Sequence, residues 1–550
     1  MGAGLRTHRS RRLERPKVGI ELKQRRIGAC IVKTSRRGSG STRQGGRNAH
    51  TGAPMEISVK NFGPISKGTI KMRPLTVIIG PSNSGKSYMA RLSYCIYRSF
   101  QILRSGFNVS LDSFMPSEDL HSTASSYTYA LSDMRTLVKK LHHERDIAIP
   151  TSTVSHIHDA LLHPFPNTLA KELRREFRGD LQNLVRFPTS GFSIGVSGTL
   201  KVRLGWPSNP RANLQVSHMA KHWAVLDQHL GTVSLKTELD GKTRIDPLPS
   251  HAEHFAAGTS KELEDDIARN LVHMIMGKIR TTALPADTST LFFSLSRPVL
   301  MNILGSHSSS EDDERHTDSE LDQFSPPGLP KGFFKFVLSI DVHKPGPLSK
   351  LADMMERDLL GGSVSLNKSL HASLPTISFK TQSGDVPLRL TSSHVGSMAL
   401  LTIYLKYLIK PGYRIIIEEP EAHMHPANQL KFAKHVALLI RHGVNVTLVT
   451  HSVLIVEQLS AYMMLGSLDK SHRKKAVSEP EAYLTLDDVS AHEFVVDSSG
   501  NCIIRDLPRT KHDGIDQEEF GKMRFNMYEE RLSFRQQIEA YMGDPEDEKA

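Results

Sequence analysis

The chain of 550 residues has few cysteines and no long apolar run. Its three cysteines, Cys30, Cys95 and Cys502, lie far apart and in no spacing typical of a metal or redox site. No run of about 18 apolar residues is present that would cross a membrane. Residues 1–54 also lack the apolar core that a secretory signal needs. We therefore expect a cytoplasmic protein with no membrane partner.

The protein also lacks a basic surplus outside its first 54 residues. These hold 14 of the 70 Lys and Arg residues and two of the 58 Asp and Glu residues, so residues 55–550 carry 56 of each sign. The segment is rich in Arg, Gly, Ser and Thr without apolar periodicity, which predicts disorder. It is either a basic arm that binds phosphate backbones or a stretch upstream of a true start at Met55. The second alternative is favoured, because a strand pattern opens at Met55.

The pattern after Met55 indicates an α/β fold. Leu75–Ile79 is apolar apart from one threonine, as expected for a strand that is covered on both faces of a parallel sheet. Apolar residues then recur at helical spacing from Met89 to Leu103. Further apolar strands are predicted at Tyr413–Ile417 and Val444–Thr450, with a helix from Ser397 to Leu408 before the first strand and another helix between the two strands.

The strand at Leu75–Ile79 is followed by the pattern of a phosphate-binding loop, in which two glycines bracket four residues before Lys-Ser. The loop consists of Gly80, Pro81, Ser82, Asn83, Ser84, Gly85, Lys86 and Ser87. A strand before it and a helix after it would aim backbone N–H groups at the phosphates of ATP. Lys86 would neutralise the β- and γ-phosphates, and the Ser87 hydroxyl would bind Mg²⁺.

Two glutamates follow the apolar strand at Tyr413–Ile417. Glu418 would hold Mg²⁺, whereas Glu419 would polarise the water that attacks the γ-phosphorus. The alternative is that this acidic pair belongs to a solvated turn. The phosphate loop elsewhere in the chain favours the catalytic interpretation.

A histidine ends the next predicted strand. His451 stands where parallel sheets gather their ligands, and it is predicted to contact the γ-phosphate. His423 and His425 have the spacing of a metal pair, but no further ligands cluster near them in the sequence, so a conformational loop beside the acids is favoured.

The segment from Glu418 to Pro426, together with Thr450-His451-Ser452, resembles the ABC-type ATPase heads of the SMC, RecF and OLD group. It is most similar to stand-alone bacterial and archaeal AAA-family ATPases of the AbiEii or OLD-like type. The resemblance covers residues 55 to about 103 and 355 to about 535, and it implies a P-loop NTPase fold with a long insertion. It also implies a signature serine, best matched by Ser393, that reaches ATP on the other subunit of a homodimer. His394 departs from that pattern, since glycine is usual there.

Composition and the resemblance together predict four regions. Residues 1–54 form a basic extension, 55–109 and 355–550 form the two parts of an ATPase head, and 110–354 form a mixed helical and β insertion. A flexible loop is expected at about 305–331, because Ser, Asp, Glu and Pro are concentrated there. The glutamine loop of such heads is not identifiable, and no Toprim nuclease pattern follows His451.

The sequence thus predicts a Mg²⁺-dependent ATPase. By resemblance, turnover would serve DNA transactions or phage defence, with DNA or a toxin or nuclease protein as partner. Two alternatives remain. One is a regulatory module that senses ATP with little turnover, and the other is the ATPase subunit of an ABC transporter. The long insertion and the lack of a standard signature argue against the transporter.

Overall fold

The computed structural model describes residues 55–105, 117–198, 200–207, 215–216, 220–227, 232–239, 241–248, 260–284, 289–294, 340–367, 376–516 and 518–542. The predicted basic extension and the loop predicted at about 305–331 lie outside these ranges. Within them, no helix is long and apolar enough to span a bilayer.

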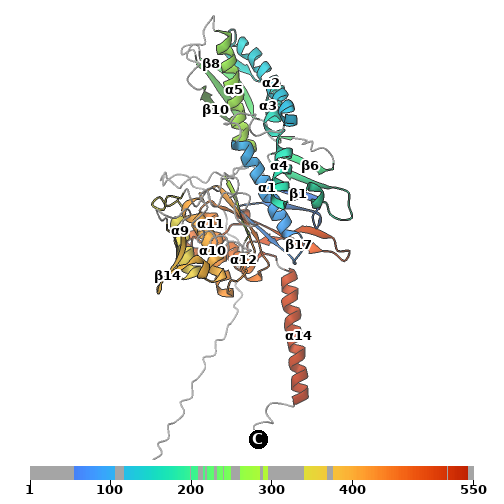
Figure 1. The fold of residues 1–550 in the computed structure, drawn as a ribbon, viewed down its shortest axis with the longest axis vertical. Coiled ribbons are helices and arrows are strands. Elements are labelled where there is room, and N and C mark those ends of the chain that lie inside the picture. The colour runs from blue at the N-terminus through green and yellow to red at the C-terminus, as the bar shows by residue number, and fades with distance from the viewer. Residues whose placement is uncertain are drawn as a thin grey trace, which may run out of the picture. The chain divides into compact units, whose positions relative to one another are not determined.

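Eleven of the described strands form one sheet, in the order β11-β15-β16-β3-β17-β18-β2-β1-β5-β6-β7. Figure 1 labels β1, β6 and β17 of this sheet. The strands are β1 (Met55–Phe62), β2 (Ile65–Met72), β3 (Leu75–Ile79), β5 (Phe192–Ser197), β6 (Leu200–Trp206), β7 (Gln215–Val216), β11 (Ser289–Ser294), β15 (Tyr413–Glu418), β16 (Asn445–Val449), β17 (Val489–Val496) and β18 (Cys502–Asp506).

The sheet has a parallel half and an antiparallel half. β11, β15, β16, β3 and β17 pair in parallel, whereas β2, β1, β5, β6 and β7 pair in antiparallel. β18 joins the halves, antiparallel to β17 and parallel to β2. β5, β6, β7 and β11 come from residues within the predicted insertion.

β3 is buried on both faces, as its apolar sequence predicts. Ile78 packs in one apolar cluster, whereas Leu75, Val77 and Ile79 pack in the other. β15 alternates in the same way, with Ile416 in the first cluster and its neighbours in the second. Strands with two apolar faces need layers above and below them, so the strands that lead into the site described below are covered on both faces.

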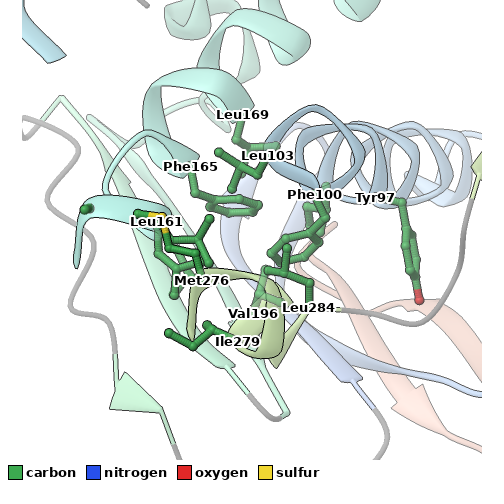
Figure 2. Close-up of a cluster of buried hydrophobic side chains, with 14 of the residues drawn as sticks. Tyr97, Phe100, Leu103, Leu161, Phe165, Leu169, Val196, Met276, Ile279 and Leu284 are labelled. Atoms are coloured by element: carbon green, nitrogen blue, oxygen red, sulfur yellow. The ribbon is translucent and has the colours of Figure 1, made fainter. Parts of the chain in front are cut away.

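One of these layers combines α1 with helices from residues 117–283. In Figure 2, Phe100 of α1 lies against Phe165, and their rings stack with centroids 4.5 Å apart. Met276, Ile279 and Val196 belong to the same apolar cluster. The elements of this region are α1 (Lys86–Ser105), α2 (Ser117–Lys140), α3 (Thr151–Leu162), α4 (Phe165–Phe177), α5 (Lys261–Ala283), the 3-10 turn η3 (Leu181–Leu184) and a small sheet of β4 (Asp146–Ala148), β8 (Lys221–Asp227), β9 (Thr232–Leu239) and β10 (Lys242–Pro247).

The second apolar cluster joins the helices after residue 348 to strand residues such as Val77 and Ile417. α10 begins at Ser393 rather than at the predicted Ser397, because the Ser392 side chain accepts a hydrogen bond from the Val395 N–H and caps the helix there. The elements of this part are α9 (Ser349–Met355), η4 (Glu356–Leu360), β12 (Ser363–Asn367), β13 (Thr376–Thr381), β14 (Gly384–Pro387), η5 (Leu388–Leu390), α10 (Ser393–Tyr407), α11 (Pro426–Arg441), α12 (Val453–Gly466), α13 (Lys470–Ala476), η6 (Leu486–Asp488), β19 (Arg509–Thr510), β20 (Gly514–Ile515) and α14 (Glu518–Met542).

Candidate functional site

The predicted phosphate loop connects the buried strand β3 to helix α1, which begins at Lys86. Two of its turns require glycine. Gly80 has a φ of +140°, and Gly85 has a φ of +95° with Ile65 so close that an added Cβ would lie 2.8 Å from its Cγ1. Inside the loop, the Ser84 hydroxyl donates to the Pro81 carbonyl at 2.8 Å. The backbone is therefore held in one shape by its glycines and by an internal hydrogen bond.

Three neighbouring parallel strands end at the same edge of the sheet. Val449 of β16 pairs with Ile78 of β3 on one side and with Glu418 of β15 on the other. Two backbone bonds continue this alignment past the strands: Thr450 N donates to Ile78 O at 3.0 Å, and Glu419 N donates to Val449 O at 2.8 Å. The phosphate loop, the two predicted acids and the predicted histidine consequently follow three aligned strand ends.

The two acids at the end of β15 have different surroundings. Glu418, the last residue of the strand, is 6 % exposed. Glu419 has a φ of +45°, which is rare for a residue with a side chain, and its side chain is 56 % exposed. The change in backbone direction directs one carboxylate into the protein and leaves the next accessible to water. Positive φ outside glycine is costly and is concentrated at functional sites.

His451 lies beside Glu419. Its Nε2 is 3.7 Å from Glu419 Oε1. Burial lowers the pKa of His451, and the positive charge of Lys86 acts in the same direction, while Glu419 and Glu421 oppose them. The imidazole is therefore neutral near pH 7, where a ring N–H still donates a hydrogen bond.

Lys86 is 5 % exposed, and its Nζ donates to the Pro81 carbonyl at 2.5 Å. Burial lowers its pKa, whereas the charges of Glu419, Glu421 and Glu418 oppose that change. Three carboxylates thus act electrostatically on one ammonium group. The structure brings together Lys86, Glu418, Glu419 and His451, which come from three separate segments of the sequence.

The remaining predicted residues lie as follows. His425 caps α11, with its Nδ1 accepting a hydrogen bond from Ala427 N at 3.2 Å, and His423 is exposed. Ser393 is exposed at the start of α10, a helix that packs against α9. The next residue, His394, points its Nε2 at the Leu359 carbonyl at 3.1 Å.

One acidic residue of the site was given no role from the sequence, and a second acid lies on the strand next to the phosphate loop. Glu421 lies in the predicted loop beside the acids, and its carboxylate accepts hydrogen bonds from Thr450 and His451. Glu493 of β17 pairs with Ile79 directly before the phosphate loop and is 9 % exposed. The third acid in Glu418-Glu419-Pro420-Glu421 was the available signal for Glu421. Nothing in the sequence marked Glu493, because strand order was unknown.

The donor groups of the site fit magnesium. Mg²⁺ prefers oxygen ligands and is usually held by one or two protein groups together with phosphate oxygens and water. Ser87 offers a hydroxyl in the first turn of α1, and Glu418 offers a carboxylate at the end of β15. In the described ranges, no group of three or more His, Cys, Asp or Glu side chains is placed to hold a metal by itself. A magnesium ion here would therefore depend on the nucleotide for its other ligands.

The sheet, the loop and the acids fit a P-loop ATPase fold. No family model matches the chain, and no curated protein matches it. Solved structures similar to it include the SMC head domain from Thermotoga maritima, with 11 % identity, 82 % of this chain and 98 % of that chain covered, and a TM-score of 0.29. An Smc head domain with an extended coiled coil bound to the C-terminal domain of ScpA, from Pyrococcus furiosus, has 11 % identity, coverage of 86 % and 98 %, and a TM-score of 0.30. Likeness at this level carries no conclusion about activity.

Proposed function

We propose that this protein is an ATPase that binds Mg²⁺ and ATP at the phosphate loop and hydrolyses the γ-phosphate. The observation that supports this most strongly is the arrangement of Lys86, Glu418, Glu419 and His451 around the aligned ends of β3, β15 and β16. Each of these groups has a chemistry that phosphoryl transfer needs, and the strands that hold them are buried on both faces.

The phosphates would be held by the loop. Its backbone N–H groups and the start of α1 favour negative charge, and Lys86 adds a positive charge. Ser87 and Glu418 would hold the magnesium ion, which neutralises charge on the β- and γ-phosphates when bound. The buried position of Glu418 favours this role, because a buried carboxylate gains most from a cation partner.

Glu419 would orient and polarise the attacking water. Its exposed carboxylate has access to solvent, and a carboxylate accepts a proton from the water as the P–O bond forms. His451 would donate a hydrogen bond from its neutral ring to the γ-phosphate. The His451 Nε2 is 3.7 Å from Glu419 Oε1, so one histidine would lie beside both the phosphate and the catalytic carboxylate.

We propose further that two copies of the chain bind ATP between them, with Ser393 of one copy reaching the nucleotide of the other. The support is that Ser393 is exposed at the start of a 15-residue helix, where the helix dipole favours a phosphate. The OLD-like subfamily, the role in DNA transactions or phage defence, and a toxin or nuclease partner remain expectations from the sequence resemblance.

A phosphate-release assay tests the activity. Wild-type protein with Mg²⁺ and ATP, with and without DNA, is compared with Lys86→Ala as the background control. Turnover that disappears in Lys86→Ala supports the ATPase. ATP binding by the wild type without phosphate release under either condition would favour the sensing module instead.

A further inference from the structure

The Glu421 side chain links two loops of the candidate site. It lies in the loop after β15, and its carboxylate accepts hydrogen bonds from the loop after β16. Its Oε1 accepts from His451 N at 2.5 Å, and its Oε2 accepts from the Thr450 hydroxyl at 2.8 Å. Both bonds end on an ionised acceptor, which makes them stronger than bonds between neutral groups.

These bonds hold a part of the backbone that the sheet does not hold. β16 ends at Val449, and the last backbone bond along it is from Thr450 N to Ile78 O. His451 N lies one residue beyond, and Glu421 supplies its acceptor. The position of the His451 ring relative to Glu419 therefore depends on a side chain from the neighbouring loop.

The Glu421 loop is itself tied to the catalytic region. Ala422 N donates to Glu419 O at 3.0 Å, and Met424 N donates to Glu421 O at 2.8 Å. A second connection runs through α11, where Gln429 accepts from the Ser452 hydroxyl at 2.6 Å. Its amide also donates to the Met424 carbonyl at 3.1 Å. The two loops thus form one hydrogen-bonded unit.

We propose that Glu421 is a positioning residue for ATP hydrolysis, which sets His451 against Glu419 by fixing the backbone at Thr450 and His451. This inference rests on the proposed ATPase activity. Glu421 does not itself touch the reacting atoms, and it acts on the reaction through His451. Its loss leaves the His451 N–H and the Thr450 hydroxyl without their acceptor and removes one of the two connections that hold the histidine loop, the other being the bond from Ser452 to Gln429.

The test is a double-mutant cycle on kcat and on ATP affinity. The variants are Glu421→Ala, His451→Ala and the two combined, with Glu481→Gln as a control, because Glu481 is 65 % exposed and faces Lys470 only at 3.9 Å. Glu421→Ala should lower kcat roughly 10- to 100-fold, the cost of a small misplacement of a catalytic group, with ATP affinity little changed. In the His451→Ala background the same change should have almost no further effect.

Two further measurements separate positioning from folding. Glu421→Gln keeps one carbonyl acceptor, so its kcat should lie between wild type and Glu421→Ala. Hydrogen exchange at the His451 N–H should accelerate by roughly tenfold or more in Glu421→Ala and not in the control. Thermal unfolding identifies a variant that fails to fold, and Glu421→Gln then replaces it in the cycle.

The outcomes are distinct. Full additivity of the two substitutions, or an unchanged kcat in folded Glu421→Ala, would overturn the positioning role while leaving the ATPase intact. An inactive wild type would instead refute the proposed activity, and the positioning role with it.

Discussion

The first glycine of the phosphate loop should tolerate no side chain. Gly80 follows the buried strand β3 at a φ of +140°. A Cβ there would lie 2.4 Å from the Phe494 carbonyl oxygen and 2.9 Å from the Phe494 Cβ. Phe494 is fully buried on β17, the parallel neighbour of β3, so its backbone has little room to move. Gly80→Ala should therefore destabilise the protein and displace the loop.

The cost has two sources. Holding alanine in a backbone region that favours glycine costs about 1–3 kcal/mol. A carbon and an oxygen normally approach no closer than about 3.3 Å, so the added Cβ forces a separation of roughly 1 Å in a packed sheet. Overpacking of this kind costs about 1–3 kcal/mol. The free energy of unfolding should fall by roughly 2–6 kcal/mol in total.

Two other glycines serve as controls. Gly500 also has a positive φ, +73°, but nothing lies within 4 Å of an added Cβ. Gly500→Ala should therefore show the backbone cost alone, about 1 kcal/mol. Gly277 lies inside α5 with the same open space, so alanine there should stabilise by about 0.5–1 kcal/mol.

Urea unfolding gives the free energy of each variant, and titration with ATP gives its affinity. Gly80→Ala should lose both stability and ATP binding, whereas Gly500→Ala should bind like the wild type. The close approach of β17 to the loop would be refuted if Gly80→Ala were no less stable than Gly500→Ala.

Three further predictions concern the dimer, acid stability and the basic extension. Light scattering should show that Glu419→Gln shifts from monomer to dimer with Mg²⁺ and ATP but not with ADP, and that adding Ser393→Arg abolishes the shift; a mass that never changes would contradict the shared site. Burial lowers the pKa of His222 and His435 from 6.5 to about 4, so their stabilising contribution is complete above pH 6.5 and is lost as the pH falls toward 4. As the pH falls through that window, each histidine should lower the free energy of unfolding by about 1.4 kcal/mol per pH unit. His222→Gln should therefore flatten the pH dependence of the free energy measured by urea unfolding. Deleting residues 1–54 should leave ATPase activity unchanged, and if the full chain binds DNA through this segment, the deletion should also flatten the salt dependence of binding.

The local elements of the site were predictable from the sequence. β3 has the predicted bounds, Leu75–Ile79, because a run of apolar residues followed by glycine has few other structures open to it. α1 and β15 also follow their predicted apolar patterns closely. The spacing of apolar residues within each of these segments is enough to predict its structure, and this spacing can be seen in a single sequence.

Long-range pairing was not predictable in the same way. β11 pairs with β15, and β5 pairs with β1, across more than 100 residues of chain. β17 was missed, because buried His492 and Glu493 interrupt its apolar pattern. The polar residues are accommodated by partners from other strands, such as the Lys71 N–H that donates to His492 Nε2 at 3.0 Å.

The roles of the three neighbouring glutamates were only partly readable. Their sequence places them close together but does not say which one is buried, which faces water and which binds the next loop. The positive φ of Glu419 separates the directions of the first two side chains, so that Glu418 is buried and Glu419 faces water. Glu421 then reaches His451, a contact that only the parallel pairing of β15 and β16 makes possible.

Glu419 is proposed to be the carboxylate that activates the attacking water, in a site whose other groups bind ATP. The most direct test measures ATP affinity and single-turnover phosphate release for wild type and Glu419→Gln on the same preparations. The substitution keeps the shape of the side chain and removes its charge. ATP affinity should be preserved while the hydrolysis rate falls roughly 10²-fold or more, as expected for the loss of a positioned general base. A Glu419→Gln protein that hydrolyses ATP at the wild-type rate would contradict the account.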